Sequence, residues 1–239
     1  MLENISFLIQ SRIGRNIMIR AVLFDLDGTL LNRDASLKSY IDKQYDRWES
    51  YLYHIPKQQY ISRFLELDCH GYVWKDKVFQ QLIDEFHIHT SWQELLSDYI
   101  EKFQHHCIPF ANLIPMLKQL KKQSIQLGMI TNGKGIFQTN NIKALGMEEF
   151  FEVILVSESE GIKKPDPEIF NRALNSMSVS AEESIFVGDH PTNDVKAAKD
   201  VGMISVWKRA EQWDKIKADF IIDDLMEIFT IVAYFNENT

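Results

Sequence analysis

The sequence predicts an α/β protein whose core is a doubly wound parallel sheet and which carries a smaller helical domain. Two patterns support this fold class. Late in the chain, short apolar runs alternate with segments that have apolar residues at helical spacing. This order is typical of a parallel sheet covered by helices on both faces. Residues 32–109 interrupt the alternation because they are poor in strand-like runs and rich in aromatic and charged residues.

Apolar runs mark the predicted strands of the core. The first, AVLFD at 21–25, ends abruptly in a polar turn that contains glycine, which indicates a buried strand. Later in the chain, similar runs are found at 125–130, 153–156, 184–187 and 203–206. A further run at 219–222 is a candidate for a sixth strand.

The predicted core helices lie between these runs, at 111–123, 136–145, 166–177 and 191–201. Two of them are bounded by glycines that suit a helix C-terminus, Gly146 and Gly202. Asp166 followed by Pro167 is typical of an N-cap residue and a proline at the first helical position. We therefore expect a helix to begin at this point.

The interrupting segment, 32–109, is predicted to be a helical domain inserted after the first strand, because its apolar residues recur at helical spacing. The core would then consist of 1–31 and 110–239. Met18 stands just before the first strand, so residues 1–17 are a candidate N-terminal extension.

The composition is that of a folded globular protein and disfavours several functional classes. The 239 residues are 45% hydrophobic and 25% charged, and 26 basic against 34 acidic residues give a net charge of −8. A negative surface repels phosphodiester backbones, so nucleic acid is not an expected partner. No apolar run approaches the ~18 residues of a membrane span.

Cys69 and Cys107 are too few for a disulfide framework, and the N-terminus lacks the features of a secretory signal. We expect a reduced, cytoplasmic protein without a membrane partner, present as a monomer or a weak homodimer.

The informative polar residues follow the predicted strands. They are Asp25, Asp27, Thr131, Asn132, Lys164, Asp189 and Asp194. In an open parallel sheet, ligands bind outside the carboxyl ends of the strands, so we expect these residues to converge on one site.

This set of residues suits metal-assisted phosphoryl transfer. Several aspartates in one crevice are unfavourable unless a cation joins them. Mg²⁺ is the expected cofactor, because it is usually held by carboxylates, water and the phosphate oxygens of a substrate. An aspartate can attack phosphorus to form a labile aspartyl-phosphate, and a second aspartate can transfer the protons.

Four segments carry a family resemblance: DLDGTL at 25–30, ITNG at 130–133, KPDPEIF at 164–170 and VGDHPTND at 187–194. In order and spacing they resemble the motifs of the haloacid dehalogenase superfamily of phosphatases and phosphotransferases, over about residues 19–235. The resemblance implies a Rossmann-like core in which the inserted segment is a cap that closes over the site and determines specificity.

The resemblance also implies a role for each residue. Asp25 would be the nucleophile and Asp27 the general acid and base. Thr131, with Asn132, would contact the phosphoryl oxygens, and Lys164 would stabilise charge. The expected Mg²⁺ ligands are Asp25, the backbone carbonyl of Asp27, Asp189 and, in support, Asp194.

We therefore expect a phosphomonoesterase for a small phosphorylated metabolite, such as a nucleotide, a sugar phosphate or phosphoglycolate. A sugar-phosphate mutase is the main alternative, although TNG at 131–133 resembles the phosphatases more closely. A 2-haloacid dehalogenase is disfavoured because Asp27 is present. A further alternative is a sensor that binds a phosphate ligand without turnover. His190 follows Asp189 and is either a substrate contact or a loop residue.

Overall fold

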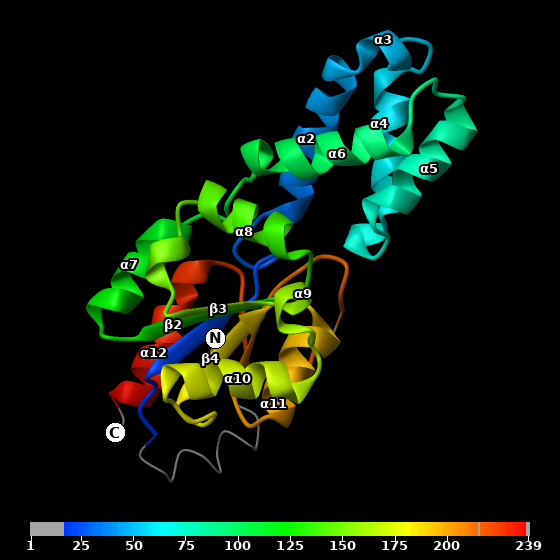
Figure 1. Cartoon of the computed structure of the whole chain (residues 1–239). Helices are drawn as coiled ribbons and strands as arrows, with labels where there is room; N and C mark the ends of the chain where they lie inside the picture. Colours follow the sequence, from blue (N-terminus) through cyan, green and yellow to red (C-terminus); the bar gives the residue numbers. More distant parts are fainter. Residues whose placement is uncertain (1–16, 215, 238–239) are drawn as a thin grey trace. The chain divides into compact units, whose positions relative to one another are not determined.

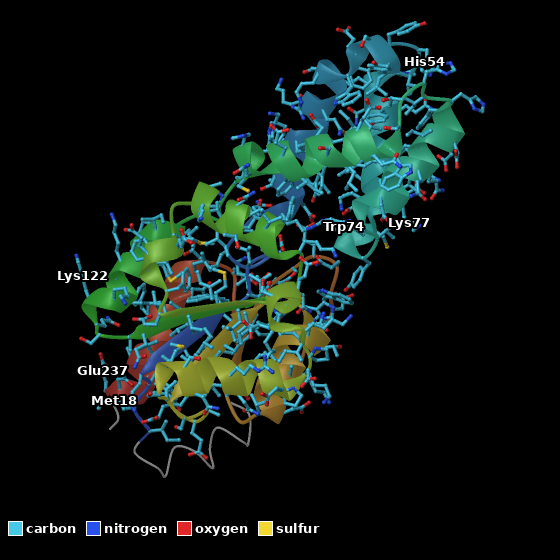
Figure 2. All side chains as sticks on the ribbon, viewed as in Figure 1. Met18, His54, Trp74, Lys77, Lys122 and Glu237 are labelled. Carbon is cyan, nitrogen blue, oxygen red and sulfur yellow. The ribbon has the colours of Figure 1, made fainter. Side chains whose placement is uncertain are left out.

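The structure is a computed structural model that describes residues 17–214 and 216–237. The chain forms two compact units (Figure 1): one runs to Leu31 and resumes at Pro109, and the other is Asn32–Ile108. The predicted N-terminal extension lies outside the described residues except for Ile17. That residue is buried, whereas Met18, labelled in Figure 2, is 53% exposed.

The first unit is built on a sheet of six parallel strands in the order β3-β2-β1-β4-β5-β6. The strands are β1 (Ala21–Phe24), β2 (Gln126–Thr131), β3 (Val153–Val156), β4 (Ser184–Gly188), β5 (Ile204–Lys208) and β6 (Phe220–Ile222). This order confirms the predicted doubly wound α/β fold, including the sixth strand. The strand order reverses between β1 and β4, because β2 and β3 lie on one side of β1 whereas β4, β5 and β6 lie on the other. A ligand crevice is expected at such a point.

The apolar runs form strands because helices cover both faces of the sheet. All four residues of β1 are buried. On one face, α10 (Pro167–Met177) and α11 (Ala197–Asp200) pack against side chains that include Leu23 and Phe186. On the other lie α7 (Leu113–Lys122) and α12 (Ile228–Asn236) (Figure 1).

The remaining helical segments of this unit are α8 (Gly135–Ala144), α9 (Ser157–Glu160) and the short turns Glu148–Phe150, Pro191–Lys196 and Leu225–Glu227. Asp166 caps α10 as predicted, since its side chain accepts a hydrogen bond from the Glu168 backbone. The expected helix at 191–201 is instead a π-helical turn, Pro191–Lys196, followed by the short α11.

The second unit is helical throughout. It consists of α2 (Arg33–Arg47), α3 (Glu49–Leu52), α4 (Lys57–Asp68), Cys69–Gly71, α5 (Lys75–Phe86), α6 (Trp92–Lys102) and Phe103–His106. Its aromatic residues make a core of their own, because large rings such as Tyr40, Tyr60 and Phe64 are fully buried. Among the helices described in either unit, none is long and apolar enough to cross a membrane.

Candidate active site

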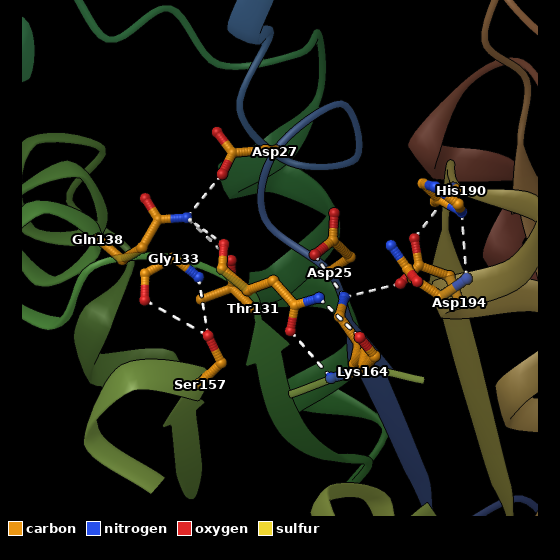
Figure 3. Close-up of polar contacts among 11 residues, drawn as sticks. Asp25, Asp27, Thr131, Gly133, Gln138, Ser157, Lys164, His190 and Asp194 are labelled. Atoms are coloured by element: carbon orange, nitrogen blue, oxygen red, sulfur yellow. Dashed lines mark hydrogen bonds and ion pairs between the residues drawn. The ribbon is translucent and has the colours of Figure 1, made fainter. Parts of the chain in front are cut away.

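The ammonium group of Lys164 joins two of the predicted aspartates at the carboxyl edge of the sheet (Figure 3). Lys164 lies in the loop before α10, and only 3% of its surface is exposed. Its Nζ atom donates to Oδ1 of Asp25 at 2.6 Å and to Oδ1 of Asp194 at 2.7 Å. Asp25 directly follows β1, and Asp194 lies in the π-helical turn after β4. The parallel topology thus brings together residues that are far apart in the sequence.

Asp25, Asp189 and Asp194 form a group that can hold a metal ion. Each offers one carboxylate oxygen, and the three oxygens lie within 4.8 Å of one another. Gly28 allows Asp189 to enter this group, because a Cβ atom at Gly28 would lie 2.4 Å from Oδ2 of Asp189. Gly28 also has a φ of +84°, a backbone conformation that favours glycine.

Burial disfavours the ionised forms of Asp25 and Asp189. It raises the pKa of Asp25 to about 7 against the opposing charge of Lys164, and the Asp194 carboxylate adds to the rise. Burial, followed by the charges of Asp25 and Asp194, raises the pKa of Asp189 well above its usual value. Although burial favours the neutral form of Lys164, Asp194 and Asp25 hold its pKa above the ordinary value.

These residues fit a hard divalent cation. They supply carboxylate oxygens only, and one lysine does not offset the repulsion among two buried acids and a half-buried one. Oxygen ligands of this kind suit Mg²⁺. Asp27 does not contribute its side chain to the group.

The side chain of Asp27 instead contacts Gln138 of α8 (Figure 3). Nε2 of Gln138 donates to Oδ2 of Asp27 at 2.6 Å and to Oγ1 of Thr131 at 3.0 Å. Gln138 is buried, with 2% of its surface exposed. The sequence motifs do not include Gln138, although a polar residue on the buried face of the predicted helix at 136–145 is a signal that could have indicated it.

Asn132 makes an unexpected contact with the backbone of Lys164. Its Nδ2 donates to the carbonyl oxygen of Lys164, and its Oδ1 accepts from the amide of Lys164, both at 2.9 Å. Neither Asn132 nor Thr131 caps α8, whose N-cap residue is Lys134. The side chain of Asn132 therefore fixes the segment that carries the buried lysine.

His190 is built into the loop after β4. Its backbone amide donates to Oδ2 of Asp194, and its ring Nδ1 accepts from the amides of Thr192 and Asn193, each at 3.1 Å. Burial lowers the pKa of the His190 ring, which favours the neutral imidazole that these contacts need. These hydrogen bonds stabilise the conformation of the loop itself.

Comparison with known proteins identifies a family and several relatives of this chain. The family described as haloacid dehalogenase-like hydrolase matches residues 22–208. A glyceraldehyde 3-phosphate phosphatase from Pyrococcus furiosus is 37% identical over 122 residues, which are 48% of this chain and 51% of that protein. The chain thus matches about half the length of this relative.

Two other similar proteins align over most of their length. The pyrophosphatase PpaX of Bacillus cereus is 24% identical over 92% of this chain and 99% of that protein. The crystal structure of a HAD phosphatase from Thermococcus onnurineus superimposes with a TM-score of 0.65 at 28% identity, covering 90% of this chain and 98% of that one.

Proposed function

The chain belongs to the haloacid dehalogenase-like hydrolases, and from that premise we propose that it is a Mg²⁺-dependent phosphatase acting through an aspartyl-phosphate. The substrate would be a small phosphorylated metabolite. The observation that carries the proposal is the buried contact of Lys164 with Asp25 and Asp194, beside Asp189. It provides a nucleophile, a fixed cation and a set of metal ligands at one edge of the sheet.

In the first half-reaction, a carboxylate oxygen of Asp25 attacks phosphorus and the phosphorus–oxygen bond of the ester breaks. The departing oxygen takes a proton from Asp27, so that the alcohol leaves neutral and the phosphoryl group remains on Asp25. In the second half-reaction, a water molecule attacks phosphorus and gives a proton to Asp27. Inorganic phosphate leaves, and the carboxylate of Asp25 is restored.

The phosphoryl group would be held by Thr131 and Lys164. Thr131 is buried, and its Oγ1 already accepts a hydrogen bond from Gln138. A hydroxyl has a single hydrogen to donate, and this arrangement leaves that hydrogen for a phosphoryl oxygen. We assign Asn132 to the same subsite through its hold on Lys164.

Asp25, Asp189 and Asp194 would hold Mg²⁺, together with the backbone carbonyl of Asp27 that the family resemblance implies. When bound, the ion offsets the charge of the carboxylates and of the phosphoryl oxygens. The buried Lys164 lies within this acidic group and neutralises part of the same charge.

The candidate substrates include both phosphate esters and phosphoanhydrides, because one relative is named for glyceraldehyde 3-phosphate and another for pyrophosphate. We propose that the helical unit, Asn32–Ile108, acts as the cap that selects among them. A sugar-phosphate mutase remains the alternative, because it would use the same aspartyl-phosphate.

Phosphate release from a panel of substrates with Mg²⁺ tests the proposal. The panel includes glyceraldehyde 3-phosphate, pyrophosphate, nucleotides, sugar phosphates, phosphoglycolate and p-nitrophenyl phosphate. Wild type should release phosphate, and Asp27→Asn should slow both half-reactions. Conversion of a sugar phosphate to its isomer with little phosphate release would favour the mutase. Binding of a phosphate compound without turnover would favour a sensor.

A further inference from the structure

Gln138 connects helix α8 to Asp27, a residue 111 positions earlier in the chain. Resting on the proposed role of Asp27 as the general acid and base, we propose that Gln138 is the positioning residue that orients the Asp27 carboxylate for proton transfer. The contact is short and direct, because Nε2 of Gln138 lies 2.6 Å from Oδ2 of Asp27 (Figure 3).

The amide of Gln138 is itself held in one orientation. Its Oε1 accepts a hydrogen bond from Nδ2 of Asn141, one turn along α8, at 3.2 Å. Its Nε2 faces three acceptors, Oδ2 of Asp27, Oγ1 of Thr131 and the carbonyl oxygen of Asn132. A flipped amide would place an oxygen against the Asp27 carboxylate, so this set of partners determines which end of the amide faces Asp27.

The packing around Gln138 leaves it little freedom to move. Gln138 is 2% exposed and Asn141 is fully buried. Gly133 makes room for the side chain, because a Cβ atom at Gly133 would lie 2.9 Å from Cγ of Gln138. A buried side chain that is held at both ends is suited to orient a neighbour.

Asp27, by contrast, has a carboxylate that needs an external support. It is half-buried, and within residues 17–214 and 216–237 its Oδ1 makes no hydrogen bond. Gln138 thus holds Oδ2 and leaves Oδ1 to exchange a proton with the ester oxygen or with water. A displacement of about 1 Å at a reacting group lowers rates by roughly 100-fold, so loss of this support should be measurable.

The role predicts a dependence on the leaving group. An alkoxide needs the proton of Asp27 in order to leave, whereas p-nitrophenolate leaves readily without it. A variant that misplaces Asp27 should therefore lose more kcat/KM on an alkyl phosphate than on p-nitrophenyl phosphate. A residue that only supports the fold, or only binds the phosphoryl group through Thr131, would lower both values alike.

The experiment compares Gln138→Met, which removes the donor at similar size, with Gln138→Glu, which keeps the shape but places a carboxylate beside Asp27. Each is assayed on p-nitrophenyl phosphate and on the alkyl phosphate that wild type hydrolyses best. The loss of kcat/KM should be at least about tenfold greater for the alkyl substrate. Gln119→Met, at an exposed position of α7, is the matched control and should leave both values unchanged.

A double-mutant cycle separates this role from others. In an Asp27→Asn background, Gln138→Met should have little further effect on the alkyl substrate, since no proton donor is left to orient. Equal losses of kcat/KM on both substrates, or additive effects of the two substitutions, would overturn the proposal for Gln138 but not the proposed function. Absence of turnover by wild type would overturn the proposed function and this inference with it. Should Gln138→Met not fold, Gln138→Glu carries the same comparison.

Discussion

Gly188 lies so close to Asp194 that a Cβ atom at Gly188 would be 2.3 Å from the Cβ of Asp194. Gly188 is the last residue of β4, and Asp194 lies in the π-helical turn that follows. The absence of a side chain at Gly188 therefore lets the turn fold back over the strand end. This places Asp194 beside Lys164.

Replacement of this glycine should weaken metal binding. In Gly188→Ala, the new methyl group must displace Asp194, and we expect the affinity for Mg²⁺ to fall at least about tenfold. Gly128→Ala is the matched control, because its Cβ would meet Leu23 and Met177 at 2.9 Å inside the core. That control should lower the melting temperature but leave the Mg²⁺ affinity nearly unchanged. Equal Mg²⁺ affinities for the two variants, measured by calorimetry, would contradict this account.

Asp25→Asn should abolish turnover while leaving the fold intact. The amide is isosteric but is not a nucleophile toward phosphorus, so we expect kcat to fall by at least about 10³-fold. The melting temperature and the circular dichroism spectrum serve as the checks of folding. Asp84→Asn, at an exposed position of α5, is the control and should retain full activity. Substantial activity in Asp25→Asn would mean that another residue attacks phosphorus.

Mg²⁺ should stabilise the protein more at pH 8 than at pH 6. Because burial raises the folded pKa of Asp25 from 3.8 to about 7, its contribution to stability is fully present below the unfolded pKa and is lost as the pH rises through about 7. With EDTA, the melting temperature should therefore fall over this range. Because Mg²⁺ would bind the ionised carboxylates, its addition should reverse this fall in melting temperature.

We expect the increase in melting temperature on adding Mg²⁺ to be larger at pH 8 by at least ~2 °C, from scanning calorimetry at both pH values. Asp189→Asn should remove most of this difference, since it removes one of the clustered carboxylates. EDTA should also abolish activity and Mg²⁺ should restore it. An equal Mg²⁺ effect at both pH values would argue against a metal site in this cluster.

Asn132→Ala should reduce activity through Lys164. The variant loses two hydrogen bonds to the backbone of Lys164. At about 1 kcal/mol each, we expect kcat/KM to fall roughly ten- to thirtyfold. Asn132→Asp keeps the acceptor for the Lys164 amide, so its kcat/KM should lie between that of wild type and that of Asn132→Ala. Asn175→Ala, at an exposed position of α10, controls for loss of an asparagine side chain. Unchanged kinetics in Asn132→Ala would show that Lys164 needs no such support.

The strands and the edge where the site lies could be predicted from the sequence. Residues buried on both faces of a parallel sheet form continuous apolar runs, as in β1. The polar residues that end these runs must then share one edge, because parallel strands point the same way. For this reason the motifs predict that Asp25, Asp189 and Lys164 lie at one edge of the sheet.

The helical turn after β4 was harder to predict. The proline and the first-turn carboxylate at 191–194 suggest an ordinary helix. The turn is π-helical, and its first residues are tied back through the ring of His190 and the carboxylate of Asp194. Local preference therefore gave the right location but the wrong helical geometry.

The sequence by itself determined the fold class, the edge of the sheet that bears the site and the residues that end its strands, because these depend on local apolar patterns and on the direction of parallel strands. Only the tertiary structure decided that Gln138 holds Asp27 and that Asn132 holds the backbone of Lys164. These hydrogen bonds join residues 111 and 32 positions apart. No local pattern encodes such pairs, because each partner is selected by the packing of α8 and of the loop before α10 against the sheet.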